Sequence, residues 1–397
     1  MRAMYLFTAL MLLGGLAFAS SNNRPALAGP SATKAASFKH DISSTGWIPF
    51  NFLNGKSVLV PAKINGHDVF VKLIDGADTS YIDKSFAASQ GLMSVANAKG
   101  SGVIDVQVQL GALTLPQVKA KVVNLGVKPS DSPLVPFILS DDLFNAAIVD
   151  IDFAHDRISF KNPQITIKPP SGAMEIPLIR RLGSLTVPVS VEGNAPVLFE
   201  WYLGDPAPVT VYEPYREAQQ LLQNKPTSIR LGGGLGGQRP QEPVATLNHI
   251  QFAGVNFFQV PAVFPSNAVR GSDSPLISGN IGLALLSRFR LVIDYPHGRL
   301  YAAPYTAMKN NSFTKDRLGM YFSQQSSYLV VDFVSPGSPA QKAGFEAGER
   351  IAAINHKPFP EWRPAELAAL GSASSGGVIV FTMQNGNDRQ VKARDYF

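Results

Sequence analysis

Two aspartates stand next to a glycine directly after an apolar run that has the length of a β-strand. Asp75 precedes Gly76, and Asp205 follows Gly204. Two carboxylates a few ångströms apart share a proton, so one can serve as a base and the other as an acid. An Asp-Gly pair is more often simply a turn. The meaning of these two aspartates therefore depends on the segments around them.

Other motifs lack the context that their chemistry needs. The stretch 232–237 has the GxGxxG spacing of nucleotide-binding loops, but the following residues 238–243 contain two prolines and cannot open the required helix. Six histidines are dispersed without metal-ligand spacing, there is no cysteine, and no Gly-x-Ser-x-Gly elbow occurs. We therefore expect no metal, no cofactor and no serine-hydrolase chemistry.

The first residues have the order of a secretory signal. Met1–Arg2 is a positive start, an apolar run covers residues 5–18, and Ala17–Ala19 is a small-x-small cleavage site. The run is shorter than the ~20 apolar residues of a membrane-spanning helix. The sequence predicts a signal peptide over residues 1–19, a flexible leader over 20–45, and a periplasmic or secreted protein without an integral membrane span after cleavage.

Composition indicates a globular protein of several domains. The chain has 397 residues, of which 45% are hydrophobic and 16% charged, and it contains 34 Gly and 30 Pro. This length exceeds one ordinary core, and many turn residues favour short strands over long helices. The formal charge of +6 comes from scattered Lys and Arg, which is not a nucleic-acid footprint.

An internal repeat organises most of the chain. The sequence Ser-Asp-Ser-Pro-Leu at 130–134 recurs at 272–276, and the same offset carries Asp152, His155 and Arg157 onto Asp294, His297 and Arg299. Both copies close on a similar strand, turn and strand, and a Pro-rich stretch at 168–170 lies between them. The sequence predicts two similar β lobes over residues 46–165 and 172–306, and a different small domain over 316–397.

The first repeat resembles the active-site strand and turn of retropepsin-like and pepsin-like aspartic proteases. Residues 69–83 read VFVKLIDGADTSYID, residues 199–211 stand at the equivalent place in the second repeat, and residues 282–295 look like the late glycine-plus-strand element of the family. The resemblance covers about residues 47–304. It implies a mainly β fold in which two tandem aspartic-protease-like lobes form a cleft and each lobe donates one catalytic carboxylate.

Two alignments of the first motif remain open. Counting back from Gly76 and Ala77 without a gap puts Ile74 at the catalytic position and Asp75 at the Thr/Ser position that supports the turn. With a one-residue deletion, Asp75 is the catalytic residue and the hydroxyl is absent.

The second lobe departs from the family pattern as well. Tyr202 stands at the aspartate position, Leu203 stands at the Thr/Ser position, and Asp205 follows Gly204. A tyrosine with a pKa of about 10 does not replace a carboxylate near neutral pH. The carboxylate pair is therefore incomplete on the ungapped alignment.

The last part of the chain is similar to bacterial PDZ domains. The match lies in residues 335–351 and 354–357, and Glu349 and His356 depart from the usual Asp and Gly. The resemblance implies that the backbone N–H groups of Leu318, Gly319 and Met320 hold the carboxylate of a bound peptide, with a helix beginning near Pro339. Peptides or protein C-termini are the implied partners.

The sequence thus predicts an exported aspartyl-protease-like protein with a PDZ domain, catalytically impaired and acting through peptide or protein binding. Two alternatives stay open. One is an active endopeptidase that uses Asp75 with an atypical partner, such as Asp205 or Asp75 of a second chain. The other is a PDZ-based scaffold protein.

Overall fold

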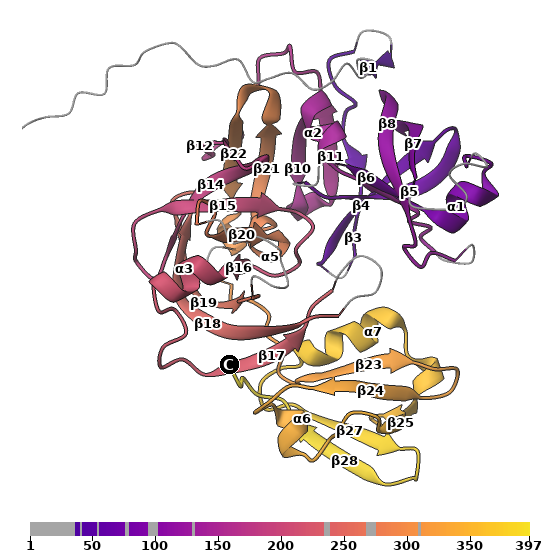
Figure 1. The fold of residues 1–397 in the computed structure, drawn as a ribbon, viewed down its shortest axis with the longest axis vertical. Coiled ribbons are helices and arrows are strands. Elements are labelled where there is room, and N and C mark those ends of the chain that lie inside the picture. The colour runs from indigo at the N-terminus through magenta and orange to yellow at the C-terminus, as the bar shows by residue number, and fades with distance from the viewer. Residues whose placement is uncertain are drawn as a thin grey trace, which may run out of the picture. The chain divides into compact units, whose positions relative to one another are not determined.

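The computed structural model describes residues 36–39, 42–53, 55–75, 79–93, 102–128, 132–233, 239–266, 275–308 and 311–397. The predicted signal peptide, most of the leader, and Gly76 and Ala77 lie outside these residues. The described chain is mainly β, as predicted (Figure 1). No helix in the described ranges is long and apolar enough to cross a membrane.

The first repeat forms a sheet with the strand order β1-β8-β6-β9-β5-β4-β3, and β7 pairs with both β4 and β8. Its strands are β1 (Ser37–Phe38), β3 (Asn51–Leu53), β4 (Ser57–Ile64), β5 (His67–Leu73), β6 (Ser80–Asp83), β7 (Val103–Leu110), β8 (Leu113–Val123) and β9 (Phe137–Leu139), and its helices are α1 (Lys84–Ser89) and α2 (Asp141–Ala146). The double pairing of β7 closes the sheet on itself.

The second repeat forms a sheet with the order β13-β14-β15-β20-β16-β19-β18-β17, and β18 pairs with both β14 and β19. Its strands are β13 (Ile179–Arg181), β14 (Ser184–Val191), β15 (Val197–Tyr202), β16 (Val209–Val211), β17 (Thr227–Leu231), β18 (Gln241–Phe252), β19 (Val255–Val263) and β20 (Gly279–Gly282), and its helices are α3 (Glu213–Ala218) and α5 (Leu283–Leu286). The run β14-β15-β20-β16-β19 has the same pairing directions as β4-β5-β9-β6-β8. The sequence repeat is thus a repeat of topology.

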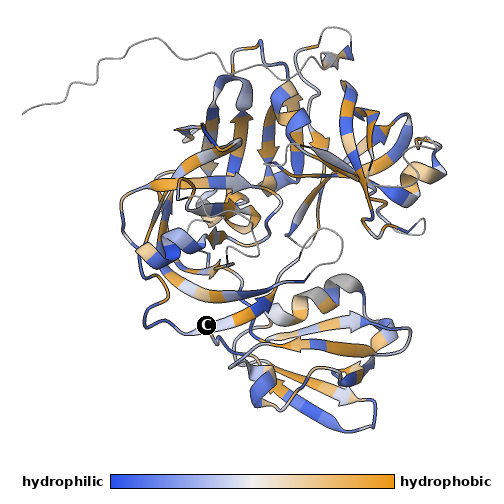
Figure 2. Ribbon diagram, in the orientation of Figure 1, coloured by the Kyte–Doolittle hydropathy of each residue, from blue (hydrophilic) through white to orange (hydrophobic). Residues whose placement is uncertain are grey.

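Alternation of side chains explains why these segments form half-buried strands. Every second residue of β7 is buried, and its turn to β8 places Gly111 at a φ of +57°. Figure 2 shows hydrophobic and hydrophilic residues in turn along β7 and β8. Because side chains of a strand point alternately to the two faces, this pattern puts one face into the core and the other into water.

A third sheet joins strands from both repeats in the order β12-β22-β21-β10-β11-β2. The strands are β2 (Ile48–Pro49), β10 (Ile148–Asp152), β11 (Arg157–Lys161), β12 (Met174–Pro177), β21 (Phe289–Asp294) and β22 (Arg299–Pro304), with the short 3₁₀ turns η2 (Phe153–His155) and η4 (Tyr295–His297). The two repeats meet where β10 pairs with β21 in antiparallel register. One continuous hydrophobic core runs through both lobes.

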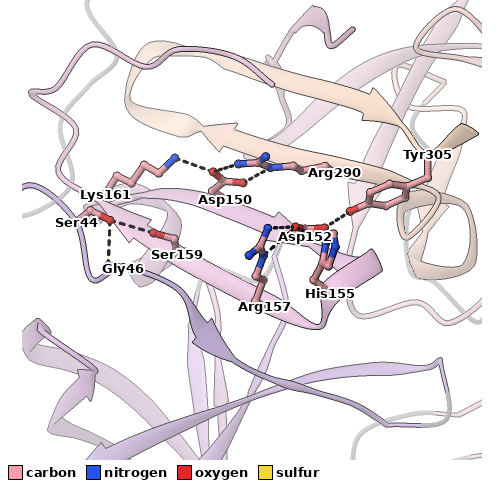
Figure 3. A network of polar contacts seen from close by, with 10 residues as sticks. All are labelled: Ser44, Gly46, Asp150, Asp152, His155, Arg157, Ser159, Lys161, Arg290 and Tyr305. Carbon is pink, nitrogen blue, oxygen red and sulfur yellow. Dashed lines mark hydrogen bonds and ion pairs between the residues drawn. The ribbon is translucent and has the colours of Figure 1, made fainter. Parts of the chain in front are cut away.

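Buried Asp150 ties the two repeats together at this junction (Figure 3). Lys161 from β11 donates to it at 2.6 Å, and Arg290 from β21 donates to both carboxylate oxygens at 3.0 Å each. A buried carboxylate is tolerated only when it is paired and hydrogen-bonded. The cationic partners of Asp150 therefore fix the register between the halves of the chain.

Asp152 has a parallel role at the end of β10 (Figure 3). It accepts from His155 and Arg157 of its own hairpin and from the hydroxyl of Tyr305, which follows β22. Burial raises the pKa of Asp152, but the bonds from Tyr305, Arg157 and His155 outweigh it and lower that pKa below its usual value.

The second repeat contains the same set of groups around its own aspartate. Asp294 contacts His297 at 2.7 Å and Arg299 at 3.5 Å. The repeated Asp, His and Arg of the sequence are therefore structural partners that close each hairpin.

The C-terminal residues form a separate sheet with its own hydrophobic core and the order β23-β24-β25-β27-β28, with β26 beside β25. Its strands are β23 (Met320–Gln324), β24 (Leu329–Val334), β25 (Arg350–Ile354), β26 (Lys357–Pro358), β27 (Val378–Met383) and β28 (Asp388–Lys392). The turn η5 (Thr306–Met308) precedes this sheet. The helices and turns of the domain are α6 (Pro339–Lys342), η6 (Phe359–Glu361), α7 (Pro364–Ala369) and η7 (Leu370–Ser372). The helix predicted near Pro339 is α6, and β23 is an edge strand of the sheet.

Replacing Asp150 by Asn should lower the free energy of unfolding of the lobes by about 2–4 kcal/mol, because Arg290 and Lys161 lose their buried counter-charge but keep partial access to water. Urea unfolding followed by tryptophan fluorescence measures this loss. The control is Asp156→Asn, at an exposed turn position with a φ of +47° that Asn tolerates well. Equal effects of the two substitutions would show that Asp150 does not tie the lobes together.

Candidate functional site

The end of β5 brings the first candidate segment to the lobe junction. Leu73 pairs with Leu139 of the parallel strand β9, and the N–H of Ile74 donates to the Leu139 carbonyl at 3.0 Å. Asp75 follows as the last described residue of this segment. Side chains alternate along an extended chain, so Ile74 and Asp75 point to opposite sides of this segment.

The second repeat delivers its segment in the same way. Trp201 of β15 pairs with Ile281 of the parallel strand β20, and Tyr202 pairs with Gly282. The repeat offset carries Leu139 onto Ile281. The pairing registers therefore match Ile74 with Tyr202 and, one residue later, Asp75 with Leu203.

A hydrogen bond joins the two matched positions across the lobes. The backbone N–H of Leu203 donates to Asp75 Oδ1 at 2.6 Å. Asp75 is only 1% exposed, and its Oδ2 has no hydrogen-bond partner among the described residues. The carboxyl group thus supports the junction of two strand ends and is shielded from solvent.

Burial raises the pKa of the Asp75 carboxyl well above its usual value. The Leu203 N–H opposes this rise, whereas the nearby carboxylates of Asp141 and Glu200 add to it. A carboxyl group in such surroundings favours its neutral form, because the charged form loses hydration and faces like charges.

An aromatic cluster from three elements lies next to this carboxyl group. Phe144 of α2, Trp201 of β15 and Tyr295 of η4 are in mutual contact, with ring centroids 5.2–5.8 Å apart. Burial raises the pKa of Tyr295, and the charge of Asp75 raises it further. Tyr295 therefore lies close enough to Asp75 for the two groups to interact electrostatically.

Asp205 is held by its own loop and by the neighbouring strands β16 and β20. Its Oδ1 accepts the N–H of Ala207 at 2.9 Å, and its Oδ2 accepts from Thr210 at 2.6 Å and from Asn280 at 2.8 Å. Both oxygens are therefore engaged. These bonds are typical of an aspartate that organises a turn.

Two glycines allow the close approach of this loop to its neighbours. A Cβ on Gly204 would lie 2.5 Å from the Tyr202 ring, so that ring lies over Gly204. A Cβ on Gly282 would lie 2.2 Å from the Ala207 carbonyl oxygen. The structure thus brings Ile74, Asp75, Tyr202, Gly204 and Asp205 to neighbouring strand ends, while Gly76 and Ala77 lie outside the described residues.

No group of three or more His, Cys, Asp or Glu side chains that could hold a metal occurs in the described part of the chain. A surface cavity of about 510 Å³ lies over β4 and β5 and is lined in part by Pro61, Lys63 and Phe70. Neither Asp75 nor Asp205 lines it.

The C-terminal sheet contains the second candidate site, the loop before β23. Asp316 accepts the N–H groups of Leu318 at 2.9 Å and of Gly319 at 3.0 Å on a single oxygen, and its other oxygen accepts the Tyr396 hydroxyl at 3.0 Å. Burial raises the pKa of Asp316, and these three donors oppose the rise. Two of the three N–H groups that the sequence assigned to a peptide carboxylate therefore already bind a carboxylate of the chain itself.

Sequence reasoning did not single out Asp316. The sequence did contain a signal for this role. The side chain of an aspartate commonly accepts the backbone N–H groups of the residues two and three positions later, here Leu318 and Gly319. Trp201 and Tyr295 were also missed as neighbours of Asp75. Asp75 belongs to the first lobe and Tyr295 to the second, so these two residues come together only through the pairing of the lobes.

Asp75→Asn should change the pH dependence of stability in a defined direction. The unfolded carboxyl group ionises at about pH 3.9, and the native one has a raised pKa, so wild-type stability falls as the pH rises from 4 toward the native pKa. Asn keeps an oxygen for the Leu203 N–H and does not ionise. We expect equal melting temperatures of both proteins near pH 4 and a higher melting temperature of the variant at pH 7. The difference in their free energies of unfolding should grow by at most about 1.4 kcal/mol per pH unit.

The melting temperatures can be measured by calorimetry in steps of half a pH unit. Asp68→Asn, at an exposed position of β5, is the control and should show no such divergence. A wild-type protein that gains stability relative to Asp75→Asn as the pH rises would show that Asp75 is ionised in the native state.

Comparisons with known proteins find similarity to a domain family and to solved structures. Residues 330–385 match the family described as "PDZ domain". The crystal structure of an aspartic proteinase from Irpex lacteus is similar to the chain with 14% identity and a TM-score of 0.37, over 68% of this chain and 100% of that one. A search of curated protein sequences found no match. The protein is thus mainly β, with two topologically equivalent lobes followed by a C-terminal PDZ domain.

Proposed function

We propose that this chain is an exported protein with aspartyl-protease-like lobes that are catalytically impaired, and that it acts by binding peptides or proteins through its PDZ domain. The observation that carries the proposal is the register of the two lobes. The matched strand ends present Ile74 and Tyr202 where a pair of carboxylates would be needed, and Asp75 bonds the Leu203 N–H one residue later.

Aspartic-protease chemistry requires two carboxylates that share a proton, one to activate water and one to polarise the scissile carbonyl. Ile74 has no titratable group. Tyr202 has a phenol, which neither accepts a proton from water nor shares one at mildly acidic pH. The ungapped alignment of the sequence, with Asp75 in the supporting position, is the one that fits this geometry.

The alternative is an active endopeptidase that pairs Asp75 with Asp205. In this alternative both groups would have to lose their present hydrogen bonds. Asp75 is buried, and both oxygens of Asp205 accept hydrogen bonds, from Ala207, Thr210 and Asn280. A catalytic water molecule must be held by carboxylate oxygens that are free to accept its hydrogen bonds and are open to solvent. The burial of Asp75 and the hydrogen bonds of Asp205 therefore favour a catalytically impaired protein.

The PDZ domain supports peptide binding by strand addition at β23. Gln325 and Tyr328 form the bonded pair at the hairpin end, so the N–H of Gln324 points away from β24. β23 is an edge strand, and a row of outward N–H and C=O groups on an edge accepts an extended chain.

The proposal of export rests on the N-terminal residues of the sequence. The positive start, the apolar run and the small-x-small site are those of a signal peptide, and residues 1–35 lie outside the described structure. Release of the peptide would give a protein of the periplasm or the exterior. The absence of cysteine is compatible with either compartment.

The purified mature protein should not cleave a mixed peptide library between about pH 3 and 7. Mass spectrometry of the peptides measures the cleavage. Asp75→Asn and a pepstatin-type inhibitor are run in parallel. Loss of a catalytic acid or base lowers a rate by ~10²-fold or more, so a real activity would vanish in the variant. Wild-type cleavage that the substitution abolishes and the inhibitor blocks would overturn the impaired-protease proposal and establish the endopeptidase.

Peptide binding should depend on the edge of β23. We expect full-length protein to bind members of a fluorescent peptide library with micromolar affinity, measured by fluorescence polarisation. Gln324→Pro should weaken binding about tenfold or more, because proline removes an outward N–H without disturbing the bonds to β24. Gln324 is exposed, so the fold tolerates the change.

The matched control is Gln390→Pro on the opposite edge strand β28. Ala393 and Met383 form bonded pairs with Gly377 and Asn387, so the N–H of Gln390 also points outward, and its side chain is exposed. This variant should bind like wild type. Equal loss in both proline variants, or no loss in either, would contradict strand addition at β23.

A further inference from the structure

The loop before β23 holds a carboxyl group of the chain itself. One oxygen of Asp316 receives the N–H groups of Leu318 and Gly319 at 2.9 and 3.0 Å. Convergent backbone N–H groups of this kind form an anion-binding concavity. Its anion here belongs to the chain itself.

The Asp316 side chain is held from the other side as well. Its second oxygen accepts the Tyr396 hydroxyl at 3.0 Å. The backbone of Gly371, in the middle of η7, approaches so closely that a Cβ there would lie 2.9 Å from Asp316 Oδ1. Its carbonyl accepts the Arg317 N–H at 2.7 Å. Contacts from three parts of the domain therefore fix this carboxylate in the loop.

The edge of β23 after this loop has backbone groups that point away from the sheet. The carbonyl of Gly319 accepts the N–H of Ser335 at 2.8 Å, so it points toward β24. In a trans peptide the C=O and the next N–H point in opposite directions, so the N–H of Met320 points away from β24. The edge of β23 is thus able to pair with an added strand, whereas the end of that edge is occupied by the Asp316 carboxyl group.

We propose that Asp316 takes the place of a ligand carboxylate and makes this PDZ domain select internal extended segments of its partners rather than their C-termini. The proposal rests on peptide binding at β23, the function proposed above. A C-terminal carboxylate at the loop would compete for the same two N–H groups and would lie beside the Asp316 carboxyl group, and two carboxyl groups that close cannot both ionise without repulsion. An internal segment has no such group and continues past the loop.

Pairs of peptides test this selectivity in full-length protein. Each binding sequence is made with a free C-terminal acid, with a C-terminal amide, and with three further residues appended, and its Kd is measured by fluorescence polarisation. For wild type we expect the Kd values of acid and amide to agree within about twofold, because a charge-assisted bond to the loop, worth about tenfold in Kd when present, is not made. An acid that binds tenfold tighter than its amide would overturn the proposal.

Two substitutions assign the effect to Asp316. Asp316→Ala frees the Leu318 and Gly319 N–H groups and should create a preference of about tenfold for the acid. Asp316→Asn keeps an oxygen on both N–H groups and should show no such preference. A folded Asp316→Ala protein without preference for the acid would contradict the role given to this side chain.

Hydrogen exchange gives a readout that needs no peptide and no binding. In peptide-free wild type and Asp316→Asn, residue-resolved mass spectrometry should find the amides of Leu318 and Gly319 protected, and in Asp316→Ala their exchange should be at least tenfold faster. Fast exchange in wild type would show that Asp316 does not occupy the loop and would overturn the proposal. Absence of binding for every peptide form, in wild type and variants alike, would contradict the proposed function of the domain and the selectivity that rests on it.

Discussion

A buried carboxylate at the junction of the two repeats is the interaction on which the arrangement of the lobes depends. Asp150 on β10 binds Lys161 of its own hairpin and Arg290 of β21, and β10 and β21 are the strands through which the halves of the chain pair. A one-residue slip of this pairing would turn Asp150 away from Arg290 and leave a buried charge without its partner. The register of the shared sheet is therefore strongly specified.

The register of β10 against β21 determines which residues of the two lobes come into contact near the ends of β5 and β15. Because β10 and β21 are fixed against each other, α2 and η4 bring Phe144 and Tyr295 into contact with Trp201. The same junction places the Asp75 carboxyl against the Leu203 N–H. A charged group in this apolar setting is costly, which is why burial raises the pKa of Asp75.

The two candidate sites have a common physical feature. In each, the carboxyl group of an aspartate accepts hydrogen bonds from the backbone. Asp75 accepts the N–H of Leu203, and Asp316 accepts the N–H groups of Leu318 and Gly319. Such bonds satisfy backbone donors that would otherwise need water or a ligand. Carboxylates that the sequence presents as chemical groups can therefore act as internal supports.

The sequence by itself determined the mainly β character, the repeated lobes and the PDZ-like tail, because these follow from local periodicity, turn residues and a repeated pattern. It also raised both alignments of Asp75. The sequence left both open, because one residue of register moves a side chain to the opposite face of a strand and leaves the composition of the motif unchanged. The pairing of Leu73 with Leu139 and of Trp201 with Ile281 places Asp75 opposite Leu203. The contact between Asp316 and Tyr396 likewise joins residues far apart in the chain, and only the packing of the domain brings them together.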